Sequence, residues 1–62
     1  MLNKVFIIID DRGKPLAGKL DERDAVRYLA SLADVPYGEV ENLDADAIKE
    51  VTGYSLVAIY VD

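Results

Sequence analysis

Residues 5–21, VFIIIDDRGKPLAGKLD, decide the fold, because they contain two strands, a turn and the start of a helix. Val5–Ile9 is a run of β-branched and aromatic residues, which favours a strand. Asp10–Lys14 predicts a turn, since aspartate bonds nearby backbone amides and glycine takes a positive φ at no steric cost. Pro15–Leu20 predicts a return strand, and its proline and glycine place that strand at a sheet edge.

The segment after this hairpin predicts the main helix, which begins after Asp21 and ends near Asp34. Asp21 is a good N-cap residue, and Asp24 lies three positions further on, as in a capping box. Pro36 disfavours helical backbone at the residue before it, so the helix should end there. Apolar residues fall on one arc at helical spacing, namely Ala25, Val26, Leu29, Leu32 and Ala33.

A shorter helix and a final strand complete the chain. Asp44 is the expected N-cap of the helix, and Gly53 is the residue at which it should end. Tyr54–Val61 then predicts the closing strand. We expect a single α+β domain, residues 1–62, with a three-stranded sheet and helices packed on one of its faces.

Size and composition restrict the chemistry. A chain of 62 residues buries only about 60% of its unfolded surface, so it depends on good packing or on association. There is no histidine and no cysteine, which removes disulfides, thiolate metal sites and the Cys-His and Ser-His-Asp catalytic arrangements. We therefore expect a non-enzymatic protein with no catalytic residue and no cofactor.

Hydropathy and charge indicate where the protein works. No stretch approaches the ~20 apolar residues of a membrane span, and the run at Val5–Ile9 is shorter than the roughly 7–15 residues of a signal-peptide core. We expect a cytoplasmic protein. The net charge is −5, and residues 28–62 hold seven acidic residues and one basic residue. Such a balance disfavours direct nucleic-acid binding, which depends on Lys and Arg neutralising phosphates.

Two acidic motifs are candidates for a metal site. Asp10-Asp11 follows a strand, but neighbouring strand residues point to opposite faces, and turn chemistry explains both aspartates. Residues 42–46, NLDAD, are similar to the start of an EF-hand loop. That loop also requires glycine at its sixth position and glutamate at its twelfth, where this chain has Ala47 and Gly53. We expect no metal site.

Residues 28–43, YLASLADVPYGEVENL, resemble a helix-turn-helix of the bacterial repressor type. The chain departs from that pattern at Asp34, where the family usually has glycine. It also departs at Glu39 and Glu41, which lie in the segment that would be the recognition helix. Phosphates would repel an acidic helix in the major groove. We expect a helix-helix corner here.

Residues 9–29, IDDRGKPLAGKLDERDAVRYL, are similar to the hairpin-helix part of nucleotide-sensing CBS modules. In that family a Ser or Thr precedes, by three residues, an aspartate that holds ribose. Asp24 matches this aspartate, whereas Asp21 replaces the hydroxyl and Pro15 is an insertion. The resemblance implies a nucleotide site near residues 18–24. The layout of hairpin, helix and closing strand also resembles small acidic accessory proteins encoded by phages.

The first and last strands are apolar on both faces, which is typical of strands that are covered on two sides. The predicted helices can cover one face, so the other would expose more apolar area than monomers usually do. Either the short C-terminal helix covers this face, or the face forms a homodimer or docks on another protein, and of these we expect the homodimer. The self-association residues would be Val5, Ile7, Ile9, Val57, Ile59 and Val61.

An acidic segment is the second candidate surface, and it contains one basic residue, Lys49. Its members are Glu39, Glu41, Asp44, Asp46 and Glu50. They form either a solvated face or a surface that binds a basic, nucleic-acid-binding region of another protein. The expected function is that of a small acidic interaction protein, such as a phage or mobile-element inhibitor or adaptor of a host protein. The alternative is a nucleotide-sensing or structural dimerisation module.

Overall fold

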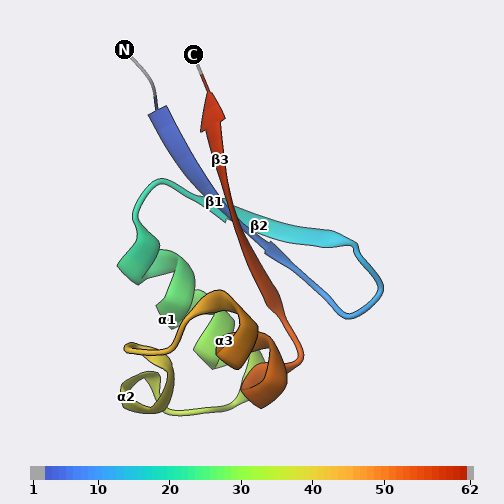
Figure 1. The fold of residues 1–62 in the computed structure, drawn as a ribbon, viewed down its shortest axis with the longest axis vertical. Helices are drawn as coiled ribbons and strands as arrows, with labels where there is room; N and C mark the ends of the chain where they lie inside the picture. The colour runs from blue at the N-terminus through green and yellow to red at the C-terminus, as the bar shows by residue number, and fades with distance from the viewer. Residues whose placement is uncertain (1–2, 62) are drawn as a thin grey trace.

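The computed structural model describes residues 3–61, which form a sheet with helices against it (Figure 1). Its elements are β1 (Asn3–Ile9), β2 (Pro15–Lys19), α1 (Glu22–Ala33), α2 (Tyr37–Val40), α3 (Ala45–Thr52) and β3 (Ser55–Val61). The predicted α+β class and the order of the elements are confirmed. The first strand begins two residues earlier than predicted, at Asn3.

β1 is the central strand of an antiparallel sheet with the order β2-β1-β3. Phe6 pairs with Lys19 on one side and with Ala58 on the other, which places these three side chains on the same face. Between Ile8 and Ile9 the register with β2 shifts, and the irregularity lies close to the hairpin turn. The hairpin therefore forms where the sequence predicts it, with an irregular pairing that the sequence does not indicate.

Local capping sets the ends of α1. The Asp21 carboxylate accepts a hydrogen bond from the backbone N–H of Arg23 at 2.7 Å, which confirms the predicted N-cap. The helix ends at Asp34, whose φ of 58° lies in the left-handed region. Its N–H donates to the carbonyls of Ala30 and Ser31. Aspartate tolerates this conformation better than most residues, and Pro36 follows as the predicted stop.

The short helices have equally local causes. α2 is a single turn of four residues. In α3, the Asp44 carboxylate accepts from the Ala47 N–H at 2.8 Å, and Gly53 ends the helix with a φ of 81°. Thr52 closes this end of the helix, because its hydroxyl donates to the Ile48 carbonyl at 2.6 Å and accepts from the Tyr54 N–H at 3.1 Å.

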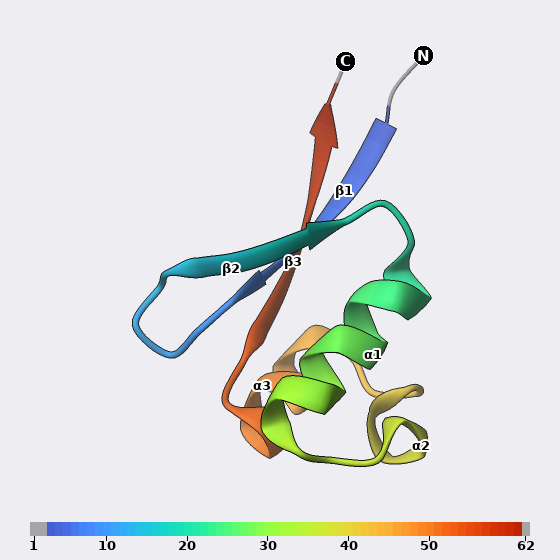
Figure 2. The ribbon, with the colours of Figure 1, turned by 180° about the vertical axis from the view of Figure 1, so that it is seen from behind.

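The core lies between the helices and one face of the sheet. Phe6 and Ile8 of β1 pack with Leu29 of α1 and Ile48 of α3. A second cluster, Val26, Ala30 and Val40, joins α1 to α2. α3 therefore covers the same face as α1, and the alternative in which the short helix covers the second face is wrong. Figures 1 and 2 show that the ends of β1 and β3 near the chain termini extend beyond the helices.

Asp44→Ala tests the cap of α3. It should lower the free energy of unfolding by about 1 kcal/mol, because the Ala47 amide loses its acceptor. Asp44→Asn keeps a side-chain oxygen and should leave stability nearly unchanged. Urea unfolding followed by circular dichroism measures both variants, and equal losses in the two would contradict a capping role.

Candidate protein-interaction surface

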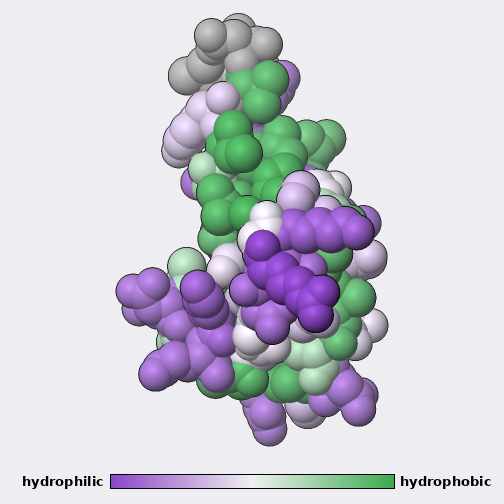
Figure 3. Space-filling model, turned by 90° about the vertical axis from the view of Figure 1, so that its right-hand side faces the viewer, coloured by the Kyte–Doolittle hydropathy of each residue, from purple (hydrophilic) through white to green (hydrophobic). Residues whose placement is uncertain are grey.

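The sheet face opposite the helices is mostly apolar, with Asn3 and Ser55 as the polar residues that β1 and β3 contribute to it. The register pairs Val5 with Ile59 and Ile7 with Val57, so these side chains share one face. We call this surface the open sheet face, and it consists of Val5, Ile7, Ile9, Val57, Ile59 and Val61. Its β1 residues are half-buried, whereas its β3 residues are exposed, with Ile59 at 47%. Figure 3 shows hydrophobic side chains gathered at the strand end of the molecule.

Gly18 leaves room for the β1 side chains on the β2 side of the open sheet face. It pairs with Ile7 across the sheet. A Cβ at this position would lie 3.3 Å from Cδ1 of Ile7 and 3.6 Å from Cγ1 of Val5. The β1 side chains therefore lie over the glycine backbone, and the apolar surface continues from β1 towards β2.

Charged side chains of the strands lie on the other face. Lys4 pairs with Tyr60, and its Nζ lies 5.2 Å from the centroid of the Phe6 ring and 5.4 Å from that of Tyr60. Lys19 pairs with Phe6, and its Nζ lies 4.9 Å from the centroid of the Tyr28 ring. Both ammonium groups are thus held over aromatic rings on the helix side. The residues of the open sheet face carry no charge.

The structure brings all six predicted self-association residues together, although whether copies associate through them stays a prediction. Sequence alternation grouped these six residues on one face, as the register shows, but it did not indicate which face of the sheet the helices leave open. It missed the reach of the strands beyond the helices, which leaves Tyr60 65% exposed on the helix side. The register of the structure accounts for this reach, because the pairing with β2 ends at Phe6 and leaves residues 3–5 paired with β3 alone.

The five predicted partner-binding acidic residues are all exposed and lie in the helical layer. Glu39 is in α2, and Glu41 follows its last residue. Asp46 and Glu50 are in α3, while the carboxylate of Asp44 is engaged as the cap of that helix. The structure therefore places these residues on the opposite side of the sheet from the open sheet face.

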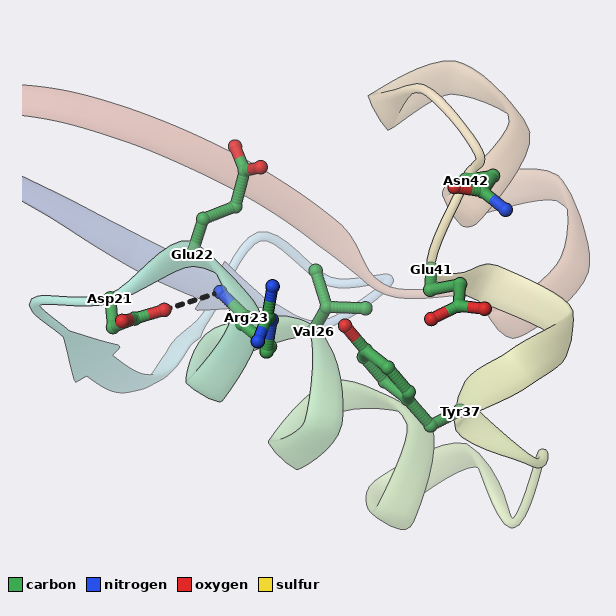
Figure 4. A pocket seen from close by; sticks show the side chains of 7 residues that line it. All are labelled: Asp21, Glu22, Arg23, Val26, Tyr37, Glu41 and Asn42. Atoms are coloured by element: carbon green, nitrogen blue, oxygen red, sulfur yellow. Dashed lines mark hydrogen bonds between the residues drawn. The ribbon is translucent and has the colours of Figure 1, made fainter.

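A groove lies between α1 and α2 (Figure 4). No sequence pattern indicated the groove itself, but its lining includes residues 21–23, which belong to the nucleotide site implied by the CBS resemblance. Its lining residues are Asp21, Glu22, Arg23, Val26, Tyr37, Glu41 and Asn42. Three carboxylates and one guanidinium are among its lining residues, a net negative charge that disfavours phosphate. Asp24, which the resemblance would assign to ribose, is not among the lining residues. The groove gives no support to nucleotide binding.

Asp10 acts as a turn residue. Its Oδ1 accepts from the backbone N–H groups of Arg12 at 2.9 Å and Lys14 at 2.8 Å, while Asp11 is exposed. Within residues 3–61, no group of three or more acidic residues is placed to hold a metal ion. In the same part of the chain, no helix has the length and apolar character needed to cross a membrane.

Comparisons of this chain with protein-family models, with curated proteins and with solved structures find no match. The resemblances to CBS modules, to helix-turn-helix proteins and to phage accessory proteins therefore stay predictions. Function has to be argued from the surface itself. Of the surfaces described above, the open sheet face departs most from what a small soluble domain usually exposes.

Replacing Asp10 tests the turn interpretation against a metal site. Asp10→Ala should lower the free energy of unfolding by about 1 kcal/mol, because two backbone amides lose their acceptor. Asp10→Asn and Asp11→Asn keep amide oxygens and should fold like the original chain. Thermal unfolding with and without Ca²⁺, Mg²⁺ or Mn²⁺ gives the readout. An ion-dependent rise in melting temperature that both asparagine variants lose would establish a metal site.

Proposed function

We propose that this protein is a small, non-enzymatic interaction protein that binds protein through its open sheet face. The observation that carries the proposal is the coverage of the sheet. All the helices pack on one side, and six Val and Ile side chains line the other. Burial of such a surface is favourable by roughly 25 cal/mol per Å² of apolar area.

The chemistry of the open sheet face suits protein binding better than small-molecule binding. Its side chains are branched hydrocarbons with few rotamers, so ordering them on binding costs little entropy. They carry no polar atoms that would need new hydrogen bonds after burial.

The acidic side of the helical layer supports a second candidate function. Its five carboxylates are exposed, and Lys49 is the one base among them. A basic, nucleic-acid-binding surface of another protein has the complementary charge. Because the acidic layer and the open sheet face lie on opposite sides, one chain could engage both partners, as an adaptor does. An inhibitor of the kind encoded by phages or mobile elements would use the acidic side alone.

Photo-crosslinking in the cells that produce the protein tests the main proposal. The crosslinker p-benzoylphenylalanine replaces Val57 on the open sheet face or, as a matched control, Glu50 on α3. We expect a covalent adduct with a protein from position 57, whatever the mass of the partner. Adducts from position 50 alone, or from neither position, would overturn binding through the open sheet face.

A salt series tests the second candidate on any partner that crosslinks from position 50. Exposed charges are largely screened beyond ~10 Å at 0.1 M salt, so association should slow as salt rises. The double variant Glu39→Gln, Glu41→Gln should slow association more than it speeds dissociation. Asp11→Asn, an exposed acidic residue of the hairpin turn, is the control. Surface plasmon resonance gives both rates, and a flat salt response would remove the acidic surface from recognition.

A further inference from the structure

We infer that the open sheet face binds a second copy of this chain, so that two sheets stack face to face with both helical layers outside. This inference rests on the proposed function, because it assigns a partner to the same face. The distribution of charge supports a second copy, and the area of the face sets the expected strength, while the two sheet edges offer a competing route that the test has to distinguish.

Because the open sheet face is uncharged, two copies of a chain of net charge −5 can associate through it without bringing like charges into contact. A symmetric dimer brings identical patches together, so any charge in the patch faces its own sign. The open sheet face consists of uncharged side chains, and Lys4 and Lys19 lie on the helix side. The exposed acidic residues lie in the helical layer, on the side of the sheet away from the contact.

Stacking through this face also separates the acidic layers. Sheets pack about 10 Å apart, and each helical layer adds about 10 Å more, so the two acidic surfaces would lie roughly 30 Å apart. That distance is well beyond the Debye length of ~8 Å at physiological salt. Contact through the helical layers would instead place carboxylates against carboxylates. Electrostatics therefore favours the sheet-to-sheet arrangement over the helix-to-helix one.

The area of the face sets the expected strength. Val57 is 39% exposed, Ile59 47% and Val61 46%, and the β1 residues add smaller contributions. The six residues expose roughly 350 Å² per copy, so two copies would bury about 700 Å² through them, within the range below roughly 1,200 Å² that is typical of weak, transient interfaces. We therefore expect a dimer that forms at micromolar concentration and dissociates on dilution.

The sheet edges offer a different route to association, which the test has to distinguish. β2 is protected as an edge by Pro15 and by the irregular register beside it, whereas β3 has no proline and no charged residue. Two β3 edges could pair to form a continuous six-stranded sheet. That arrangement would leave both open sheet faces exposed, side by side, and would remove none of their apolar area from water. Burial of apolar area therefore favours face-to-face stacking.

Sedimentation velocity of the purified chain from about 1 to 500 μM tests the inference. We expect the mass to rise with concentration from that of one chain, 6.8 kDa, to that of two. Ile59→Glu should raise the dissociation constant by about tenfold or more, as loss of a central interface residue does. The matched control is Tyr60→Glu, one residue along β3 on the opposite face, where the new carboxylate would lie beside Lys4. It should leave the dimer intact.

The outcomes separate the two proposals. A wild-type chain that stays monomeric overturns the second copy, while adducts from position 57 with a protein of another mass would keep the proposed function. A dimer that survives Ile59→Glu, or that Tyr60→Glu abolishes equally, overturns the assignment to this face. Should Ile59→Glu unfold, nuclear magnetic resonance of the unmodified chain decides. On dilution, amide shifts should change along β1 and β3, and changes confined to α2 and α3 would overturn the inference.

Discussion

One constraint shapes this molecule: the chain has enough helix to cover one face of its sheet and no more. α1 provides twelve residues and α3 provides eight. Both pack on the side of the sheet that carries Phe6 and Ile8, the two buried residues of β1. Since β1 and β3 each carry three Val or Ile residues on the other side too, the same sequence pattern that builds the core also leaves a second apolar surface outside it.

Charge follows this division. Bases of the strands lie over aromatic rings on the helix side, as Lys4 does with Phe6 and Tyr60 and Lys19 does with Tyr28. Arg27 lies over the ring of Tyr37 at 5.3 Å, within the helical layer itself. Acidic residues cap or extend the helices. The charged residues of the strands and helices therefore lie on the helical side, and the six residues of the open sheet face carry no charge.

Features set by local chemistry could be predicted from the sequence, and those set by tertiary packing could not. The caps at Asp21 and Asp44 and the stop at Gly53 need only neighbouring backbone groups. The left-handed Asp34 was missed, because aspartate signals that conformation less clearly than glycine. The face chosen by α3 was left open, because a single buried residue, Ile48, anchors it in the core. The groove joins residues about twenty positions apart, and no sequence pattern links them.

Stability and interaction are coupled in a domain of this size. Among residues 3–61, eight hydrophobic residues form the buried core, and a single small core rarely supplies more than about 3–5 kcal/mol. A protein that binds the folded chain and not the unfolded one adds stability by mass action. Covering the open sheet face would also support the ends of β1 and β3, since a two-stranded ribbon is at best marginally stable alone in water. A partner bound to the surface that the helices leave open would thus add to the buried apolar area and support the ends of β1 and β3.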